Sequence, residues 1–415
     1  MDSLKLFRSA HIYTPVDNGK ALKGAALSDI KVYDNGAVLV RNGYIEAAGP
    51  YDDVIKSLKD ETPDHVYDCE GRCVIPGFVD PHTHGCFLGL REDEFMMRLN
   101  HASYLEIHRM GGGIRRTVSK VRNASEDELA EATCCIADKA LKSGTTSIEI
   151  KSGYGLTPEH EVKILRAISK ASTMTPADIV PTFLGAHTIP EEYSGREDAY
   201  VDVVINDMLP AVAEKKLAKF CDIAVDEGFF SIKNGEKVLT AAKKLGLGIK
   251  MHADELSNFG AAKLAAKLKV TSADHLLRAD TSGLQALAES EVIACLLPAT
   301  AFSLKEPYAP ARKMIEMGVP VALATDCNPG SCYCESMEFV FQLAVLGMDL
   351  SVNEALSAAT LNSAYAIGIN KSTGSIEAGK KADFLILDGE TPAIIPYHLG
   401  HKSVKHVFKA GERII

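Results

Sequence analysis

The sequence lacks the features of a membrane protein and those of a nucleic-acid binder. No segment has the roughly 18 uninterrupted apolar residues that a transmembrane helix needs, and no apolar run follows a basic start at the N-terminus. The net charge is −10, and no tract of Lys and Arg is present. Both observations argue against a general binder of the phosphate backbone. We expect no nucleic-acid partner, no membrane association and a cytoplasmic location.

The cysteines lack the spacing of a disulfide framework. Ten are spread irregularly over 415 residues, and Cys134 and Cys135 are adjacent. Without secretion, such thiols are expected to stay reduced. Cys332 and Cys334 form a C-x-C pair, but no second pair of Cys or His stands at zinc-finger distance. We interpret this pair as packing residues.

The middle of the chain lacks a G-x-G-x-x-G motif after its first predicted strand, which argues against a nucleotide-binding sheet. Instead, apolar β-branched runs alternate with helical patterns, two of which have clear start signals. These are a capping box from Ser125 to Glu128 and the N-cap sequence Thr157–Pro158–Glu159. Eight strands with helical connections predict an α/β fold of the (β/α)8 TIM barrel type, with an open doubly wound sheet as the alternative. The runs are "CVIPGFVD", "TTSIEIKSG", "IVPTFLGAH", "KFCDIAVDE", "LGIKMHADE", "VTSADHL", "VIACLLPAT" and "VPVALATDCNPG".

The two ends of the chain have a different texture from the middle. The first seventy-odd residues contain short β-rich runs broken by "DNG", "RNG" and "CEG", which are hairpin signals. The C-terminal stretches "TGSIEAGKKADFLILDG" and "VKHVFKAGERII" alternate in the same way. We therefore predict a small β-sandwich domain built from residues 1–75 and 371–415, flanking a barrel of residues 76–370.

Most of the predicted barrel strands end in polar residues. In a TIM barrel these ends converge on the C-terminal face, where active sites lie. His82 and His84 are two residues apart and so can point to the same side. Together with His252 and Asp326 they would form a His₃Asp metal site with an open position, which suits zinc first and iron second. The other strand ends carry Lys151, Tyr154, His187, Asp226, Glu227, Asp254, Glu255, Asp274, His275 and Asn328.

The remaining histidines lack a partner at such a strand end. We interpret His398, His401 and His406 as surface or sheet-packing residues of the C-terminal region. His101, His108 and His160 fall in helical or loop segments.

Several long motifs in the middle of the chain resemble the amidohydrolase superfamily. They extend from about residue 76 to residue 335 and include "DPHTHGCFLGLREDEFMMRL", "ASYLEIHRMGGGI", "KSGYGL", "TFLGAHTIPEEY", "HADELSNFGAAKLAA", "SADHL", "KEPYAPARKMIE" and "ATDCNPGS". The resemblance implies a metal-dependent barrel with a small β-sandwich, one zinc or iron ion per subunit, and a homodimer. The loop "CFLGLRED" and Cys327, next to Asp326, depart from the pattern without removing a ligand.

The resemblance also implies roles for individual residues. It implies metal ligation by His82, His84, His252 and Asp326, and catalysis by Glu255, His275 and Asp326. It implies contacts to a small anionic substrate from Arg91, Tyr104, Tyr154, His187, Glu255, Asn328, Gly330 and Ser331.

The activity implied by these motifs is hydrolysis of a ring C–N bond, opening 4-imidazolone-5-propanoate to N-formimidoyl-L-glutamate. Glu255 would orient or deprotonate water, His275 would polarise the carbonyl, and Arg91 would bind the propionate. Each residue also has a plainer interpretation. Glu255 could cap the following helix, Arg91 could pair with Glu92 or Glu94, and Tyr154 could pack in its loop. We expect Lys151, which resembles the bridging lysine of binuclear relatives, to be an ordinary lysine beside a single metal.

Two other functions compete with this one. Another cyclic amidohydrolase or a deaminase of the same superfamily would use a similar metal site. A non-catalytic barrel acting as a scaffold would not need the intact ligands or Glu255.

Overall fold

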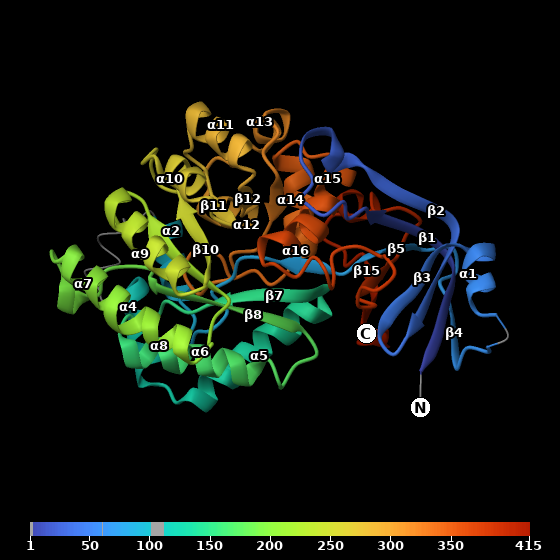
Figure 1. Ribbon diagram of the computed structural model, residues 1–415, viewed down its shortest axis with the longest axis horizontal. Helices are drawn as coiled ribbons and strands as arrows, with labels where there is room; N and C mark the ends of the chain where they lie inside the picture. Colours follow the sequence, from blue (N-terminus) through green and yellow to red (C-terminus); the bar gives the residue numbers. More distant parts are fainter. Residues whose placement is uncertain (1–2, 60, 101–111) are drawn as a thin grey trace.

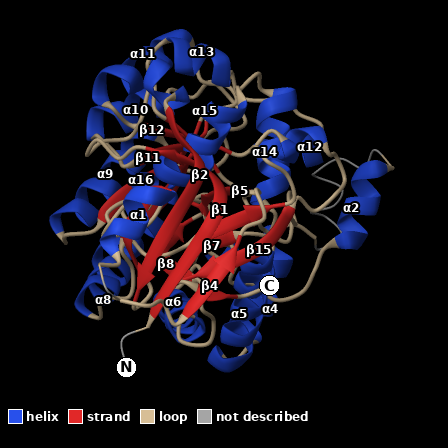
Figure 2. Cartoon of the chain, turned by 90° about the vertical axis from the view of Figure 1, so that its right-hand side faces the viewer, coloured by secondary structure: helices blue, strands red, loops and turns tan. Residues whose placement is uncertain are grey.

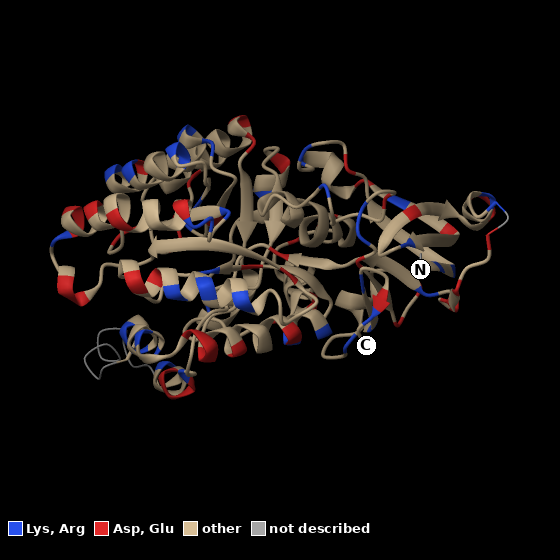
Figure 3. Ribbon diagram, turned by 60° about the horizontal axis from the view of Figure 1, so that its bottom comes forward, with Lys and Arg blue, Asp and Glu red and all other residues tan. Residues whose placement is uncertain are grey.

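Two sheets of eight strands organise the chain in the computed structural model, which describes residues 3–59, 61–100 and 112–415. The larger domain is a barrel, and the sheet built from both termini lies beside it (Figure 1). Within the described ranges, no helix is long and apolar enough to cross a membrane. The signs of charge are interspersed over the outer helices (Figure 3).

The barrel strands are parallel and follow one another in chain order, as the eight runs predict. Helices surround these strands (Figure 2). The predicted TIM barrel is therefore confirmed, and the doubly wound alternative is wrong. The strands are β6 (Phe78–Asp80), β7 (Thr145–Lys151), β8 (Asp178–Ala186), β9 (Phe220–Val225), β10 (Gly248–Ala253), β11 (Ser272–His275), β12 (Ile293–Leu296) and β13 (Val321–Leu323).

Helices connect these strands and cover the barrel. Both predicted start signals are confirmed, since Ser125 forms the full capping box with Glu128 and the Thr157 hydroxyl accepts from the backbone N–H of His160. The helices are α2 (Glu92–Leu99), α4 (Ile114–Asn123), α5 (Glu126–Lys142), α6 (Pro158–Ala171), α7 (Glu197–Val203), α8 (Leu209–Glu214), α9 (Ile232–Lys244), α10 (Ala261–Leu268), α11 (Thr281–Ser290), α12 (Pro298–Leu304), α13 (Ala311–Glu316), α14 (Met337–Gly347), α15 (Val352–Ser357) and α16 (Ser363–Ala366).

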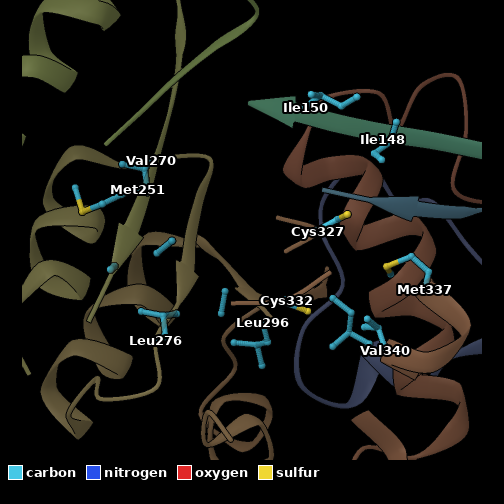
Figure 4. Packing of buried hydrophobic residues seen from close by; sticks show 14 of the residues in the cluster. Ile148, Ile150, Met251, Val270, Leu276, Leu296, Cys327, Cys332, Met337 and Val340 are labelled. Atoms are coloured by element: carbon cyan, nitrogen blue, oxygen red, sulfur yellow. The ribbon is translucent and has the colours of Figure 1, made fainter. Parts of the chain in front are cut away.

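The barrel core is apolar where strands face helices. Ile148 and Ile150 of β7 and Met337 and Val340 of α14 belong to one cluster of buried side chains (Figure 4). Each such side chain stabilises the fold by about 1.5–3 kcal/mol through its removal from water. These apolar contacts between strands and helices hold the strands in place, and the polar residues of the site follow the ends of those strands.

The two termini build one continuous sheet, which confirms the predicted domain of mixed origin. Phe7, Phe384 and Phe408 form an aromatic cluster on its inner face, with ring centroids 4.7 to 5.2 Å apart. The helix α1 (Tyr51–Ser57) contributes Val54 to a second apolar cluster. The strands are β1 (Leu4–Pro15), β2 (Ile30–Arg41), β3 (Tyr44–Pro50), β4 (His65–Asp68), β5 (Cys73–Pro76), β14 (Phe384–Leu387), β15 (Val404–Lys409) and β16 (Glu412–Arg413).

Two of the three predicted hairpin turns are wrong. "RNG" does turn the chain from β2 into β3, but "DNG" lies inside β2, where Asn35 has a φ of +48° beside a register shift against β1. "CEG" joins β4 to β5, which both run parallel to β1 and follow each other along it. "DNG" therefore forms a bulge, whereas "CEG" forms a turn, with the Arg72 N–H donating to the Cys69 carbonyl, that does not reverse the chain.

The run "CVIPGFVD" supplies two strands rather than one, because β5 belongs to the terminal sheet and β6 to the barrel. Gly77 stands between them, and a Cβ on it would lie only 2.3 Å from the Thr146 hydroxyl. The chain thus crosses from the sheet to the barrel at a residue whose backbone lies too close to Thr146 to carry a side chain. The limits assigned to the two domains stay a prediction.

Candidate metal centre and active site

Three histidines and an aspartate meet where the first and last barrel strands close on each other. Beyond β6 and β13, the backbone N–H of Asp326 donates to the carbonyl of His82, and that of His84 donates to Cys327. This closure brings Asp326 Oδ1 to 3.6 Å from His82 Nε2 and 3.4 Å from His84 Nε2. His252 Nε2, from the end of β10, lies 3.4 Å from His84 Nε2.

These separations fit a metal ion held between the four side chains. A tetrahedron with metal–ligand distances of about 2.0–2.1 Å has edges of about 3.3–3.4 Å. In the described part of the chain, His82 Nε2 and Asp326 Oδ1 are buried and have no hydrogen-bond partner. Buried polar atoms of this kind call for a partner, and a cation would provide it. His82, His84, His252 and Asp326 therefore suit a metal by spacing and by chemistry.

His275 also lies in this cluster. Its nitrogens lack hydrogen-bond partners, and its ring is grouped with those of His82 and His252 within metal-binding distance. His275 and Asp326 have positive φ values of 76° and 56°. Non-glycine residues in this conformation cost of order 1–3 kcal/mol each and are concentrated at functional sites. The Thr300 hydroxyl donates to Asp326 Oδ2 at 2.7 Å and so helps to hold that carboxylate in place.

Two buried carboxylates orient the histidines from behind. His82 Nδ1 lies 2.6 Å from Asp274 Oδ2, and His252 Nδ1 lies 3.1 Å from Asp222 Oδ2. A carboxylate on one ring nitrogen directs the other toward a metal. Burial and the nearby Lys151 charge hold the pKa of His82 well below its usual range, so the ring is neutral as metal binding requires. Burial opposes protonation of His252 too, but Asp222 outweighs it and raises the pKa.

Lys151 is not the ordinary lysine that the sequence led us to expect. Its side chain is fully buried, and its Nζ lies 2.6 Å from Glu149, 2.8 Å from Asp222 and 3.8 Å from Asp274. Burial alone would lower its pKa, but these carboxylates together raise it, which keeps the ammonium charged. Lys250, equally buried, donates to the carbonyl of Pro81 and to Glu149.

Most of these buried charged residues behind the histidines were not predicted from the sequence. A signal was present, because Glu149 precedes Lys151 by two residues on β7 and Lys250 precedes His252 by two on β10. Residues two apart on a strand share a face. Charged residues inside such apolar runs therefore had to lie behind the site.

A cavity of about 600 Å³ opens over the cluster, lined in part by His84, His252, His275 and Asp326. Arg91 lines it too, and its Nε lies 3.1 Å from Glu94, so the predicted alternative of an ion pair with Glu94 is present as well. Glu94 is buried and also accepts from the backbone N–H of Gly113. Arg98, which the sequence did not single out, is a second guanidinium in the same wall.

Glu255 faces the cavity, and the helix-capping alternative for it is wrong. The carboxylate of Asp254 accepts from the backbone N–H groups of residues 259–262 and so begins α10. Asp226 holds the adjacent loop through Leu256 and Ser257. The Glu255 carboxylate is therefore not needed for capping, and it lies 3.6 Å from His275 Nδ1.

Tyr154 and His187 form another side of the cavity. The ring of His187 stacks on His84 with centroids 4.8 Å apart, and its Nδ1 lies 3.0 Å from the Gly153 carbonyl. Tyr154 is almost fully buried, so it packs in its loop and lines the cavity at the same time. The buried carboxylate of Glu161 shapes this loop by accepting from the backbone N–H groups of residues 153, 155 and 156.

The loop after Asp326 is organised by Asn328. Its amide oxygen accepts from the backbone N–H groups of Gly330 and Ser331, and its amide nitrogen donates to the Asp326 carbonyl. All three residues of this predicted set, Asn328, Gly330 and Ser331, line the cavity. A Cβ on Gly330 would lie 2.2 Å from a terminal nitrogen of Arg91. The absence of a side chain there lets the guanidinium lie against the loop.

Gly330→Ala is therefore expected to displace Arg91 and to lower kcat/KM by roughly 10- to 100-fold, mostly through KM. Steady-state kinetics would measure the effect. Gly49→Ala in β3 is a matched control, because the nearest atom to its Cβ is 3.9 Å away, and it should leave kcat/KM unchanged. Equal KM values for Gly330→Ala and the unmodified chain would show that Arg91 does not depend on this gap.

Tyr104, His101 and His108 fall outside the described residues. Cys332 and Cys334 lie outside the three groups of described side chains that can hold a metal, and all ten cysteines are free. His398 and His401 stack on each other in the C-terminal region, and His160 caps α6 with Thr157.

The barrel with histidines and an aspartate at its strand ends defines the amidohydrolase class. A model of the amidohydrolase family matches residues 73–414. Among solved structures, a 5-methylcytosine deaminase from Klebsiella pneumoniae has a TM-score of 0.72 at 15% identity, covering 99% of this chain and 97% of that one. At that identity the likeness concerns the fold alone.

Curated relatives are much closer in sequence. An imidazolonepropionase of Syntrophobacter fumaroxidans is 52% identical over 407 residues, or 98% of this chain and 96% of the relative. An imidazolonepropionase of Desulfotalea psychrophila is 50% identical over 412 residues, or 99% of this chain and 100% of the relative. The chain belongs to the imidazolonepropionase family of amidohydrolases, and it is a hydrolase.

Proposed function

We propose that this chain hydrolyses 4-imidazolone-5-propanoate to N-formimidoyl-L-glutamate, a step in histidine degradation. The observation that carries the proposal is the cavity itself. Its floor is a His and Asp cluster able to hold a metal, and its wall presents the Arg91 guanidinium. That combination suits a small amide that carries a carboxylate.

The residues that would hold the metal are His82, His84, His252 and Asp326. Burial opposes ionisation of Asp326, but the adjacent His84 and His275 lower its pKa to about 2, so it is an anionic ligand. When bound, zinc or iron supplies Lewis acidity, which lowers the pKa of water toward 7 and polarises a carbonyl. Zinc is the first choice for this ligand set and iron the second.

Glu255 and His275 would carry the proton and stabilise charge. Glu255 takes a proton from the attacking water, and His275 donates toward the carbonyl oxygen as negative charge develops on it. The water oxygen bonds to the amide carbon, the ring C–N bond breaks, and the proton that Glu255 took from the water passes through the Asp326 carboxylate to the leaving nitrogen. The 3.6 Å contact between Glu255 and His275 Nδ1 supports these paired roles.

The substrate's propionate would bind Arg91. The Arg91 Nε lies 3.1 Å from Glu94, and one terminal nitrogen donates to the Thr117 hydroxyl at 3.3 Å. The other terminal nitrogen lies beside Gly330, which lines the cavity together with Arg91. Tyr154, His187 and the loop of residues 328–331 would contact the ring or the carboxylate. Tyr104 stays a prediction.

Turnover of freshly generated imidazolone propionate, followed by loss of its absorbance, tests the proposed function. We expect rapid loss with the metal-loaded protein and little after chelation, with elemental analysis identifying zinc or iron. Persistence of the absorbance band with fully loaded protein would refute the substrate. If the same protein instead deaminated a neutral base, the deaminase alternative would hold.

Arg91→Ala is expected to lower kcat/KM for this substrate by about 10- to 150-fold, because a charged hydrogen bond is worth about 1.5–3 kcal/mol. An imidazolone without the propionate should react with Arg91→Ala and the unmodified chain at similar rates. Arg413→Ala, an exposed change in the terminal sheet, is the control. Equal losses with both substrates would mean that Arg91 supports the structure rather than the carboxylate.

A further inference from the structure

Three groups of described side chains can hold a metal ion, and the ammonium of a buried lysine lies against one of these groups. All three groups contain His82, and two of them belong to the centre above. The third consists of His82, Asp222 and Asp274. The ammonium of Lys151 lies against this third group, 2.8 Å from Asp222 and 3.8 Å from Asp274.

The surroundings of Lys151 resemble those of a bound cation. Three carboxylates face its Nζ, from Glu149, Asp222 and Asp274, and all of these side chains have no solvent exposure. Buried carboxylates need a counter-charge, since isolated burial of a charge is very costly. Asp222 Oδ2 and Glu149 Oε2 have no hydrogen-bond partner in the described residues, and both pair with the Lys151 ammonium; Asp222 Oδ2 also lies 3.1 Å from His252 Nδ1.

Lys250 does not serve the same purpose. Its Nζ is engaged by the carbonyl of Pro81 at 2.6 Å and by the other oxygen of Glu149 at 2.9 Å. It approaches Asp274 only to 3.8 Å, and no ion pair joins it to Asp222. Lys151 is thus the cation that spans the two carboxylates behind the histidines.

We propose that the Lys151 ammonium takes the place of a second metal ion, so that the chain binds one metal although its side chains could hold two. The proposal rests on the metal centre proposed above. Lys151 acts through Asp222 and Asp274, which contact His252 and His82, and is a positioning residue. Its fixed charge keeps both carboxylates directed at the histidines without a second ion.

Removing the ammonium should therefore open a second metal site. Equilibrium dialysis of the full chain against excess zinc, followed by elemental analysis, measures the ions bound. The unmodified chain should bind about one zinc ion and Lys151→Ala about two, because oxygen and imidazole ligands suit zinc. Lys409→Ala is the matched control, since Lys409, at the end of β15 in the terminal sheet, is a buried lysine paired with Asp178 and Asp383, and it should keep about one.

The outcomes separate this inference from the metal centre on which it rests. No zinc on the unmodified chain would refute the centre itself. The role of Lys151 would be refuted, and the metal centre kept, by either of two results. These are one zinc ion on both the unmodified chain and Lys151→Ala, or two on the unmodified chain. If Lys151→Ala is unfolded without zinc, added zinc should restore its circular dichroism and thermal transition, and failure to do so would also overturn the inference.

Discussion

His252→Ala should strip the metal from the protein and lower kcat by about 10⁴-fold, since a catalytic metal contributes several kcal/mol to transition-state stabilisation. His252 contacts His84 with its Nε2 and Asp222 with its Nδ1. Its loss removes a ligand and leaves a buried carboxylate without its partner. Elemental analysis and steady-state kinetics on the same preparation measure both effects.

His398→Ala is the control for this change, because His398 is exposed and lies far along the chain in the C-terminal region. It should keep the metal and the full rate. Stoichiometric metal together with normal turnover in His252→Ala would contradict the proposed ligand set. Normal metal content with lost turnover would instead make His252 a catalytic rather than a ligating residue.

Glu255→Gln should lower kcat by about 10²- to 10⁴-fold while leaving the metal content unchanged, as expected for a general acid–base residue. The amide keeps the size of the carboxylate but cannot take a proton. Glu227→Gln is the matched control, since Glu227 lines the same cavity but is exposed at its edge.

A lower kcat for Glu255→Gln, with an unchanged kcat for Glu227→Gln, would assign the proton transfer to the Glu255 carboxylate. Similar kcat values for Glu255→Gln and the unmodified chain would remove Glu255 from the mechanism. A loss of metal from Glu255→Gln would show instead that it supports the ligands.

The sequence was most informative where residues repeat a regular pattern. Apolar runs and helix starts such as Ser125 predicted the barrel, and polar strand ends predicted which side chains meet. The predicted turn at "DNG" failed because Asn35 adopts its positive φ inside a bulged strand. Local turn chemistry cannot distinguish a bulge from a hairpin, since both need that conformation.

The parts of the site that could not be predicted depend on contacts between distant segments. No local pattern shows that Gly330 must lack a side chain to admit Arg91, or that Asp254 rather than Glu255 begins α10. The roles of Lys151 and Asp222 likewise appear only when β7 and β9 are placed beside β10 and β11. Spacing within a strand assigns a residue to a face, but it does not identify the residue on the neighbouring strand.

The closure of the barrel between His82 and Asp326 has a consequence for folding as well as for catalysis. These residues follow the first and last strands of the barrel, so an ion bound by both would cross-link segments separated by most of the domain. Such a cross-link stabilises the folded chain by favouring it over the unfolded ensemble, in which the ligands are scattered. Removal of the ion should therefore lower the thermal transition of the whole barrel, and the metal would report on assembly of the fold as much as on its chemistry.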